Sequence, residues 1–242
     1  MSVDRPAFYA LGPGGWRDWW TLLHPPYTLW HLSYVALGAA TTVHGLDRYR
    51  LGMSLLGFFL GVGLAAHALD ELRGRPLGTS IPDHVLQGLA IVALIAAGVV
   101  GVVGVIQVSA WVVAFVVVGV FLVVAYNLEV LGGRFHSDLW FAIAWGGFPA
   151  LTGAFAQDGS IDVAAVLVAA ACVAISAAQR VLSTPVRRLR RRVATVEGTI
   201  TLRDGTTEPM GADDIKTAPE AALKILSVAM PLLATAFVIS KL

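Results

Sequence analysis

The chain has 242 residues, of which 57% are apolar and only 14% charged, and its mean hydropathy is +0.73. These values lie outside the range of soluble globular domains and predict an all-α integral membrane protein. The formal net charge is +1, and nothing in the sequence indicates binding to nucleic acid. The single cysteine, Cys172, excludes a disulfide framework and a thiolate metal site.

The amino-terminal segment, residues 1–26, is rich in Gly, Pro and Trp. Trp16, Trp19 and Trp20 predict a short helix that lies at the membrane interface, with the indole rings at headgroup level. The simpler interpretation is an aromatic anchor with no further role.

Seven apolar segments follow, and we expect each of them to cross the membrane as a helix. The uncharged stretch Val85–Leu128 is too long for one span and divides naturally at residues 104–109. Six spans form a bundle over residues 27–192, and the seventh lies in residues 219–242. The predicted spans are roughly Tyr27–Gly45, Leu51–Leu69, two within Val85–Leu128, Leu139–Ala156, Ile161–Gln179 and Pro219–Ile239.

A polar insert, residues 193–218, separates the sixth span from the last. Thr195–Leu202 alternates in polarity, Arg203–Gly205 has the composition of a turn, and Thr206–Glu208 resumes the alternation. This pattern predicts a small β-hairpin. The insert is too short to be a catalytic domain, and we expect it to be a cytoplasmic cap or tether.

The basic residues predict the orientation of the bundle. With the amino terminus inside, only Arg48, Arg50 and Lys241 of the 17 Lys and Arg residues fall outside. We therefore expect a multi-pass protein of the cell (plasma) membrane with a cytoplasmic amino terminus. The basic run Arg187–Arg192 adjoins a span, where anionic lipid headgroups are the expected partner.

Five of the six histidines lie at this cytoplasmic end of the spans, His24 and His31 among them. His67, Asp70 and Glu71 have the spacing i, i+3, i+4, which places them on one face of a helix. A histidine with carboxylates suits Zn²⁺, Mn²⁺ or Fe²⁺, and carboxylates alone suit Mg²⁺. The alternative is that the two acids end a helix in water and that His67 is hydrogen-bonded in the core.

Two arginines, Arg73 and Arg75, follow these candidate ligands directly. Arginine recognises phosphate through paired hydrogen bonds, so the arrangement indicates a diphosphate site. The alternative role for both residues is positive-inside anchoring. Arg180, at the inner end of the sixth span, is a further candidate to contact an anion.

A second polar group lies between the fourth and fifth spans. Glu129 directly follows the uncharged stretch, so we expect it near the boundary of the bilayer, where it and His136 are candidates to complete a metal shell. Tyr126 and Asn127 are candidate substrate contacts. For Asp138 we favour a role as the cap of the next helix.

Residues 20–190 resemble the UbiA superfamily of intramembrane prenyltransferases. His24–Thr28 with Leu37–Ala40 is similar to that family's first span, Gly63–Pro76 to its first aspartate-rich motif, and Gly146–Ala154 to its fifth helix. The resemblance implies a UbiA-like bundle that uses a divalent metal, Mg²⁺ above all, and takes an isoprenoid or prenyl diphosphate as substrate.

The chain departs from the family pattern at several positions. Where the first motif would have Asn, Asp, Asp and Asp, this chain has Ala66, His67, Asp70 and Gly74. The stretch Gln179–Arg187 replaces the second aspartate-rich motif, and seven predicted spans compare with nine helices in the family.

Three functional hypotheses follow. The first is a UbiA-like, metal-dependent enzyme that acts on an isoprenoid or related lipid at the cytoplasmic leaflet by prenyl transfer, cyclisation or hydrolysis. The second, motivated by His67, is a transition-metal oxidase or hydrolase, and the third is a non-catalytic lipid-binding membrane protein. The candidate residues are Asp70, Glu71 and Glu129 for catalysis, Arg73, Arg75, Tyr126, Asn127 and Arg180 for substrate, and His67, Asp70, Glu71, Glu129 and His136 for the metal.

Overall fold

The computed structural model describes residues 5–242, which are mostly helical with one small antiparallel sheet. Two segments, η1 and η2, are π-helical and lie within longer continuous helices. The elements in chain order are α1 (Trp16–Leu23), α2 (Pro25–Ala39), α3 (Arg48–Phe58), η1 (Phe59–Ala66), α4 (His67–Leu72), α5 (Asp83–Gln107), α6 (Val112–Asn127), α7 (Val130–Gly133), α8 (Asp138–Ala142), η2 (Ile143–Gly147), α9 (Phe148–Asp158), α10 (Val163–Arg192), β1 (Gly198–Thr201), β2 (Thr207–Met210) and α11 (Ala212–Ile239).

Five helices are long and apolar enough to cross a membrane: Arg48–Leu72, Asp83–Gln107, Asp138–Asp158, Val163–Arg192 and Ala212–Ile239. This supports the predicted helical membrane protein, with fewer long spans than the seven expected. The other two expected spans are the shorter helices α2, of 15 residues, and α6, of 16 residues. A 15-residue helix is only about 22 Å long, whereas the hydrocarbon core of a bilayer is about 30 Å thick.

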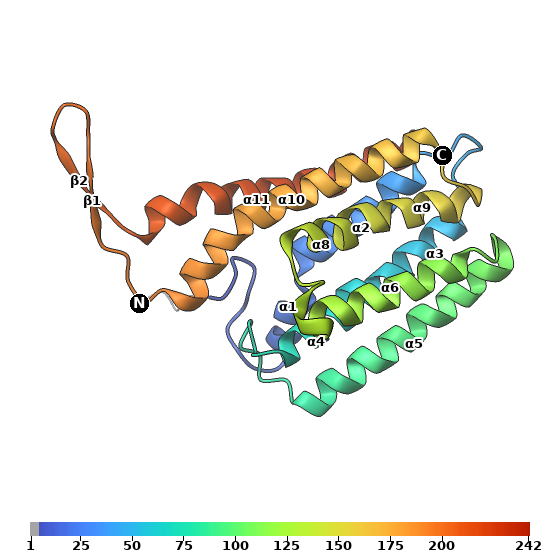
Figure 1. The fold of residues 1–242 in the computed structure, drawn as a ribbon, viewed down its shortest axis with the longest axis horizontal. Helices are drawn as coiled ribbons and strands as arrows, with labels where there is room; N and C mark the ends of the chain where they lie inside the picture. Colours follow the sequence, from blue (N-terminus) through green and yellow to red (C-terminus); the bar gives the residue numbers. More distant parts are fainter. Residues whose placement is uncertain (1–4) are drawn as a thin grey trace.

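The helices run side by side in one bundle, in which α2 packs against α9 and α11, and α11 packs against α10 (Figure 1). Small residues let α2 and α9 approach closely. A Cβ atom on Gly153 would lie 2.1 Å from the carbonyl oxygen of Val35, and one on Gly38 would lie 1.9 Å from that of Ala150. Only glycine fits at these two positions, as is usual where membrane helices touch through their backbones.

Side-chain caps and turns set the ends of the long helices. Asp47 accepts hydrogen bonds from the backbone of Tyr49 and Arg50 at the start of α3, and Asp162 accepts one from Ala165 at the start of α10. The predicted break in the uncharged stretch falls at residues 108–111, between α5 and α6. It therefore overlaps the predicted interval only at residues 108 and 109 and extends two residues beyond it.

The predicted β-hairpin is confirmed. β1 and β2 pair antiparallel, with Gly198 opposite Met210, and they project from the bundle beyond the ends of α10 and α11 (Figure 1). The helix after the hairpin begins earlier than expected, at Ala212, because the carboxylate of Asp214 accepts a hydrogen bond from the backbone of Gly211. The polar insert is therefore shorter than residues 193–218, and Pro219 lies inside α11.

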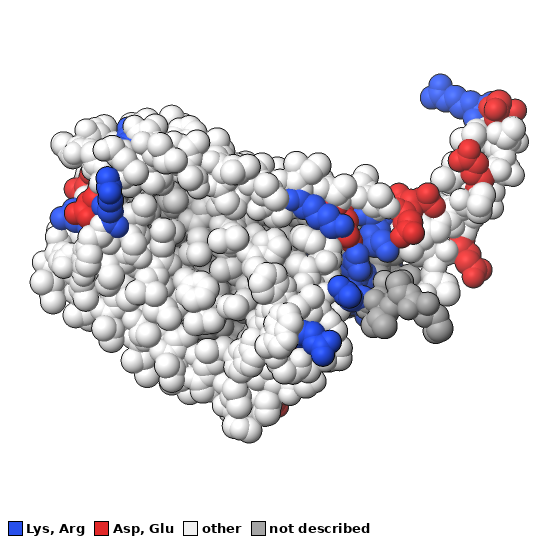
Figure 2. Space-filling model, turned by 180° about the vertical axis from the view of Figure 1, so that it is seen from behind, with Lys and Arg blue, Asp and Glu red and all other residues white. Residues whose placement is uncertain are grey.

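The surface has the pattern expected for contact with lipid. The charged side chains visible in Figure 2 gather at the two ends of the bundle and on the hairpin, and the area between is almost uncharged. Large apolar side chains face outward there, such as Ile95 of α5, which is 62% exposed. Exposed apolar area of this extent indicates contact with a membrane. We call the end that carries the hairpin the hairpin end.

Candidate functional site

A cavity of about 520 Å³ lies where the hairpin-end termini of several helices meet, and we call it the polar cavity. Its walls come from the amino-terminal segment and from α2, η1, α4, α6, η2 and α10. Eight of the predicted site residues line it: His67, Asp70, Arg73, Tyr126, Asn127, Glu129, His136 and Arg180. Segments far apart in the sequence thus deliver these side chains to one space.

Glu71 is the first predicted site residue that does not line the polar cavity. Its side chain is fully buried, and its carboxylate accepts hydrogen bonds from the backbone of Leu77 at 3.0 Å and from the backbone and hydroxyl of Thr79 at 2.8 and 2.9 Å. Adjacent residues of a helix point about 100° apart, so Glu71 departs from the direction of Asp70. It holds the loop after α4 in place.

Arg75 is the second predicted site residue that does not line the polar cavity. Its guanidinium donates hydrogen bonds to the carbonyl oxygens of Thr79 and Ile81 and pairs with Asp83 at the start of α5. Arg75 therefore stabilises the same loop. The anion contact predicted for it has no counterpart in this arrangement.

Three histidines of the polar cavity have one ring nitrogen already engaged. The His24 and His67 rings stack with centroids 4.2 Å apart; Nδ1 of His24 contacts the Tyr9 hydroxyl at 2.7 Å, and Nδ1 of His67 contacts the carbonyl oxygen of Gly63 at 3.0 Å. His136 makes the same kind of contact, from Nδ1 to the carbonyl oxygen of Tyr126 at 3.0 Å. Each ring therefore keeps its Nε2 atom for another partner.

Two polar side chains that sequence reasoning did not assign to the site also line the polar cavity. His31 is buried, and neither of its ring nitrogens has a hydrogen-bond partner among residues 5–242; the same holds for the side-chain oxygen of Gln179. Buried polar atoms are normally paired with protein, water or a ligand. The sequence feature that could have identified His31 as a site residue is its position at the same end of the spans as His24, His67 and His136.

One face of α10 supplies a wall of arginines. Arg180, Arg187, Arg188 and Arg191 recur at i, i+7, i+8 and i+11, which places them on one side of a helix, and all four line the polar cavity with Arg192. We call these four residues the arginine face. Its helical spacing is visible in the sequence, from which we predicted a substrate contact for Arg180 but not for the other three.

Two cavity arginines are neutralised by acids. Arg73 pairs with Glu129 at 2.6 Å, and Arg180 pairs with Asp138 at 2.7 Å. The predicted role of Asp138 as a helix cap is wrong. Ser137 is the cap of α8, because its side chain accepts the hydrogen bond from the backbone of Trp140. Asp138 instead faces α10, where an arginine is within reach.

The remaining charges make the polar cavity strongly basic. Within residues 5–242, Arg187, Arg188, Arg191 and Arg192 have no carboxylate partner, and Asp70 is the one cavity carboxylate without a basic partner. Four guanidinium groups without a carboxylate partner therefore line the same cavity as one carboxylate without a basic partner. Such a space favours an anion.

The predicted metal ligands do not form a coordination group. No set of three or more His, Cys, Asp or Glu side chains in the described part of the chain is arranged to hold one ion. Glu71 is engaged with the loop after α4, and Glu129 with Arg73. The metal site stays a prediction, and the arginines are the groups positioned to bind an anion.

Burial sets the protonation of the contact between Tyr9 and His24. Desolvation lowers the pKa of His24 well below its usual value, and the neighbouring His67 lowers it further; desolvation also raises the pKa of Tyr9. At neutral pH both groups are therefore uncharged, and the Tyr9 hydroxyl and Nδ1 of His24 share a hydrogen bond. This contact fastens the amino-terminal segment over the polar cavity, because Pro6, Ala7 and Phe8 also line it.

We expect His24 to make stability depend on pH. Because its pKa is lower in the folded protein, the unfolded chain binds more protons as the pH falls below about 6.5, and folded stability falls from pH 7 to 5. Asparagine tolerates the left-handed backbone of position 24, where φ is 47°. His24→Asn should therefore reduce the loss of stability between pH 7 and 5, as measured in thermal unfolding scans. The matched control, His44→Asn in the exposed loop after α2, should keep the wild-type slope; equal slopes for both variants would contradict the account.

The chain matches no protein-family model, no curated protein and no solved structure. Membership of the UbiA superfamily therefore remains a prediction that rests on the quoted motifs.

Proposed function

We propose that this chain binds the phosphate or diphosphate headgroup of an isoprenoid or related lipid in the polar cavity, at the cytoplasmic leaflet. The observation that carries the proposal is the set of four arginines without carboxylate partners in the described chain, Arg187, Arg188, Arg191 and Arg192, beside a single free carboxylate, Asp70. Arginine binds phosphate oxygens in pairs of hydrogen bonds. In a partly buried site such contacts are stronger than in water.

The place of these arginines in the UbiA pattern supports direct binding of the phosphate groups by guanidinium, without a metal ion. Where the UbiA pattern would have a second aspartate-rich motif, this chain has Gln179–Arg187, which contains two arginines and no acid. Acidic motifs hold diphosphate through metal ions, whereas guanidinium groups hold it without them. We infer that the arginine face takes the place of that motif.

A second candidate function is catalysis on the bound headgroup, as in the UbiA-like enzyme hypothesis. The observation that favours it is Asp70, a carboxylate without an ion-pair or hydrogen-bond partner in the described chain, which lines the same cavity as His24 and His67. A carboxylate and a neutral imidazole are suited to proton transfer. Asp70→Asn should then abolish turnover of a prenyl diphosphate and leave its binding intact.

Binding measurements on the purified protein test the main proposal. We expect farnesyl diphosphate to bind at least about 100-fold more tightly than farnesol, because several charge-assisted hydrogen bonds contribute about 1.5–3 kcal/mol each. Inorganic diphosphate should compete, and added salt should weaken binding. Equal affinity for farnesol and farnesyl diphosphate would refute the proposal.

A further inference from the structure

The first residues of the described chain cover the polar cavity, and we call residues 5–11 the strap. The strap crosses the hairpin end of the bundle between the end of α10 and the start of α1 (Figure 1). Pro6, Ala7, Phe8 and Tyr9 line the polar cavity from this side. The strap contains no helix or strand, so its position depends on contacts with other elements.

The Leu11 end of the strap is fastened to α1. The Thr21 hydroxyl accepts a hydrogen bond from the backbone of Leu11 at 3.0 Å. The Trp20 indole donates a hydrogen bond to the carbonyl oxygen of Tyr9 at 3.2 Å. Both contacts come from a helix outside the arginine face, so we expect the strap to open from its other end.

The Arg5 end is held by two consecutive arginines of α10. Arg190 donates a hydrogen bond to the carbonyl oxygen of Arg5 at 3.1 Å. Arg191 donates one from Nε to the carbonyl oxygen of Pro6 at 3.2 Å. Arg190 pairs with Glu220 at 2.6 Å and does not line the polar cavity, whereas Arg191 lines it and has no carboxylate partner in the described chain. Arg191 therefore lies between the strap and the polar cavity.

The guanidinium of Arg191 is able to hold the strap and an anion together. An arginine side chain has five N–H donors in a rigid plane, and the Nε–H group of Arg191 is the only one of its five that bonds to residues 5–242. The four N–H groups on its two terminal nitrogen atoms are left for phosphate oxygens. Whichever partner binds first fixes the side chain, so the second loses less conformational freedom when it binds.

We propose that the strap is a lid for the anionic headgroup: a headgroup bound to Arg191 holds the strap closed, and the closed strap slows release of the headgroup. This inference rests on the proposed function, since it concerns the regulation of the same site. The coupling acts equally in both directions, because each partner changes the binding free energy of the other by the same amount. The Arg5 end of the strap opens before the headgroup leaves.

Amide hydrogen exchange measures the opening of the strap. Ala10 is fully buried, and its backbone N–H group bonds to the carbonyl oxygen of Ala7 at 3.1 Å, so this group exchanges with solvent only when the strap opens. We expect saturating inorganic diphosphate to slow exchange in the peptide that contains residues 7–11 about fivefold or more in the wild-type protein. Mass spectrometry of the digested protein gives this rate.

Two arginine variants separate the coupling from binding alone. Arg191→Lys keeps the positive charge but replaces the planar fork by one ammonium group, so we expect it to bind diphosphate without slowing exchange of the strap. Arg187→Gln is the matched control, because Arg187 also lines the polar cavity but makes no hydrogen bond to the strap within residues 5–242. At saturating diphosphate its strap should be slowed as in the wild type.

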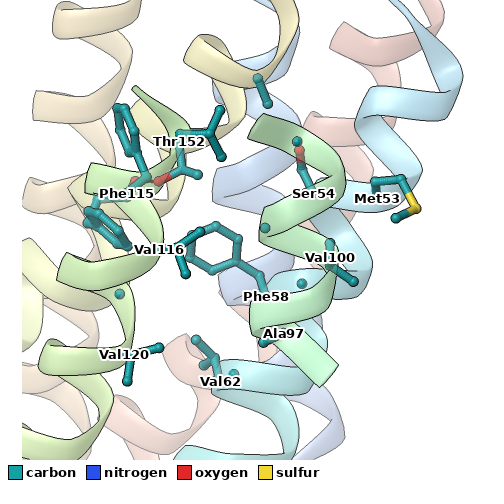
Figure 3. Close-up of a pocket in the computed structure, with 18 of the residues that line it drawn as sticks. Met53, Ser54, Phe58, Val62, Ala97, Val100, Phe115, Val116, Val120 and Thr152 are labelled. Atoms are coloured by element: carbon teal, nitrogen blue, oxygen red, sulfur yellow. Dashed lines mark hydrogen bonds between the residues drawn. The ribbon is translucent and has the colours of Figure 1, made fainter. Parts of the chain in front are cut away.

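The rate of ligand release tests the coupling in the other direction. Tyr9→Phe removes the hydrogen bond between the strap and His24 and should release farnesyl diphosphate about fivefold faster. The control for a general loss of packing is Val116→Ala. Figure 3 shows Val116 with Phe58 and Val62 beside a second cavity, of about 150 Å³, and Val116 lines neither the polar cavity nor the strap. Val116→Ala should release the ligand at the wild-type rate.

Unchanged exchange of the strap in wild-type protein saturated with diphosphate would overturn the inference and leave the proposed function standing. Equal slowing in Arg191→Lys and wild type, or release at the wild-type rate from Tyr9→Phe, would also overturn it. If the wild-type protein binds neither diphosphate nor farnesyl diphosphate, the proposed function itself fails. If Arg191→Lys no longer binds diphosphate, the wild-type exchange and the release rate of Tyr9→Phe decide, and if Tyr9→Phe does not fold, the exchange decides.

Discussion

Replacing Arg187 and Arg191 together by glutamine should weaken binding of farnesyl diphosphate about 100-fold or more. Each guanidinium lost removes charge-assisted hydrogen bonds that contribute about 1.5–3 kcal/mol, and each 1.4 kcal/mol corresponds to about a factor of ten. Both side chains line the polar cavity and lack a carboxylate partner in the described chain. Their replacement therefore breaks no internal ion pair, and the loss of binding reports on the ligand contacts. Titration by tryptophan fluorescence or calorimetry would measure the change.

The control for this variant has the same change of net charge. Arg134 and Arg203 are exposed and lie outside the polar cavity, so the double glutamine variant at these positions should bind like wild type. Arg191 also donates a hydrogen bond to the carbonyl oxygen of Pro6, at 3.2 Å, whereas the one side-chain hydrogen bond of Arg187 among the described residues goes to the Thr184 hydroxyl. Arg187→Gln alone should therefore weaken binding about tenfold without loosening the amino-terminal segment. Equal losses in the test and control pairs would show that general surface charge, rather than the arginine face, attracts the ligand.

Glu71→Ala should be the most destabilising single change in the predicted site. It leaves two backbone N–H groups and one hydroxyl, those of Leu77 and Thr79, without their buried acceptor. Each unsatisfied buried donor costs about 1–3 kcal/mol, so we expect a loss of about 3 kcal/mol or more and an unfolding temperature lower by roughly 10 °C. Thermal unfolding of the purified protein in detergent is the measurement.

The neighbouring Asp70→Asn is the contrasting variant. Asp70 has no hydrogen-bond or ion-pair partner among residues 5–242, so its replacement should leave the unfolding temperature within a few degrees of wild type. An unchanged unfolding temperature for Glu71→Ala, together with loss of metal from the protein, would support the metal-ligand role predicted from the sequence and contradict the loop-stabilising role.

Much of the fold could be predicted because it depends on local composition. The break at residues 108–111 and the turn at Gly205 both follow from patterns within a few residues. The five long helices follow in the same way from continuous apolar sequence. The interrupted helices η1 and η2 could not be predicted, because their backbones respond to neighbouring helices that the local sequence does not specify.

The candidate site was predictable in part for the same reason. The i, i+3 spacing of His67 and Asp70 placed both in the polar cavity, but Glu71 was assigned to it too, since spacing alone does not show which groups a carboxylate will meet. Arg73 and Glu129, which form an ion pair, are 56 positions apart in the sequence. Such pairs depend on how the helices pack, and so the surplus of arginine over carboxylate emerges only from the folded chain.

The most direct test of the account is to identify the lipid that the protein retains after gentle extraction from the membrane, by native mass spectrometry. We predict an isoprenoid or related lipid with a phosphate or diphosphate head, present on the wild-type protein and absent after replacement of Arg187 and Arg191 by glutamine. Retention of a neutral lipid, or of the same anionic lipid by both proteins, would contradict the central claim that the arginine face holds an anionic headgroup.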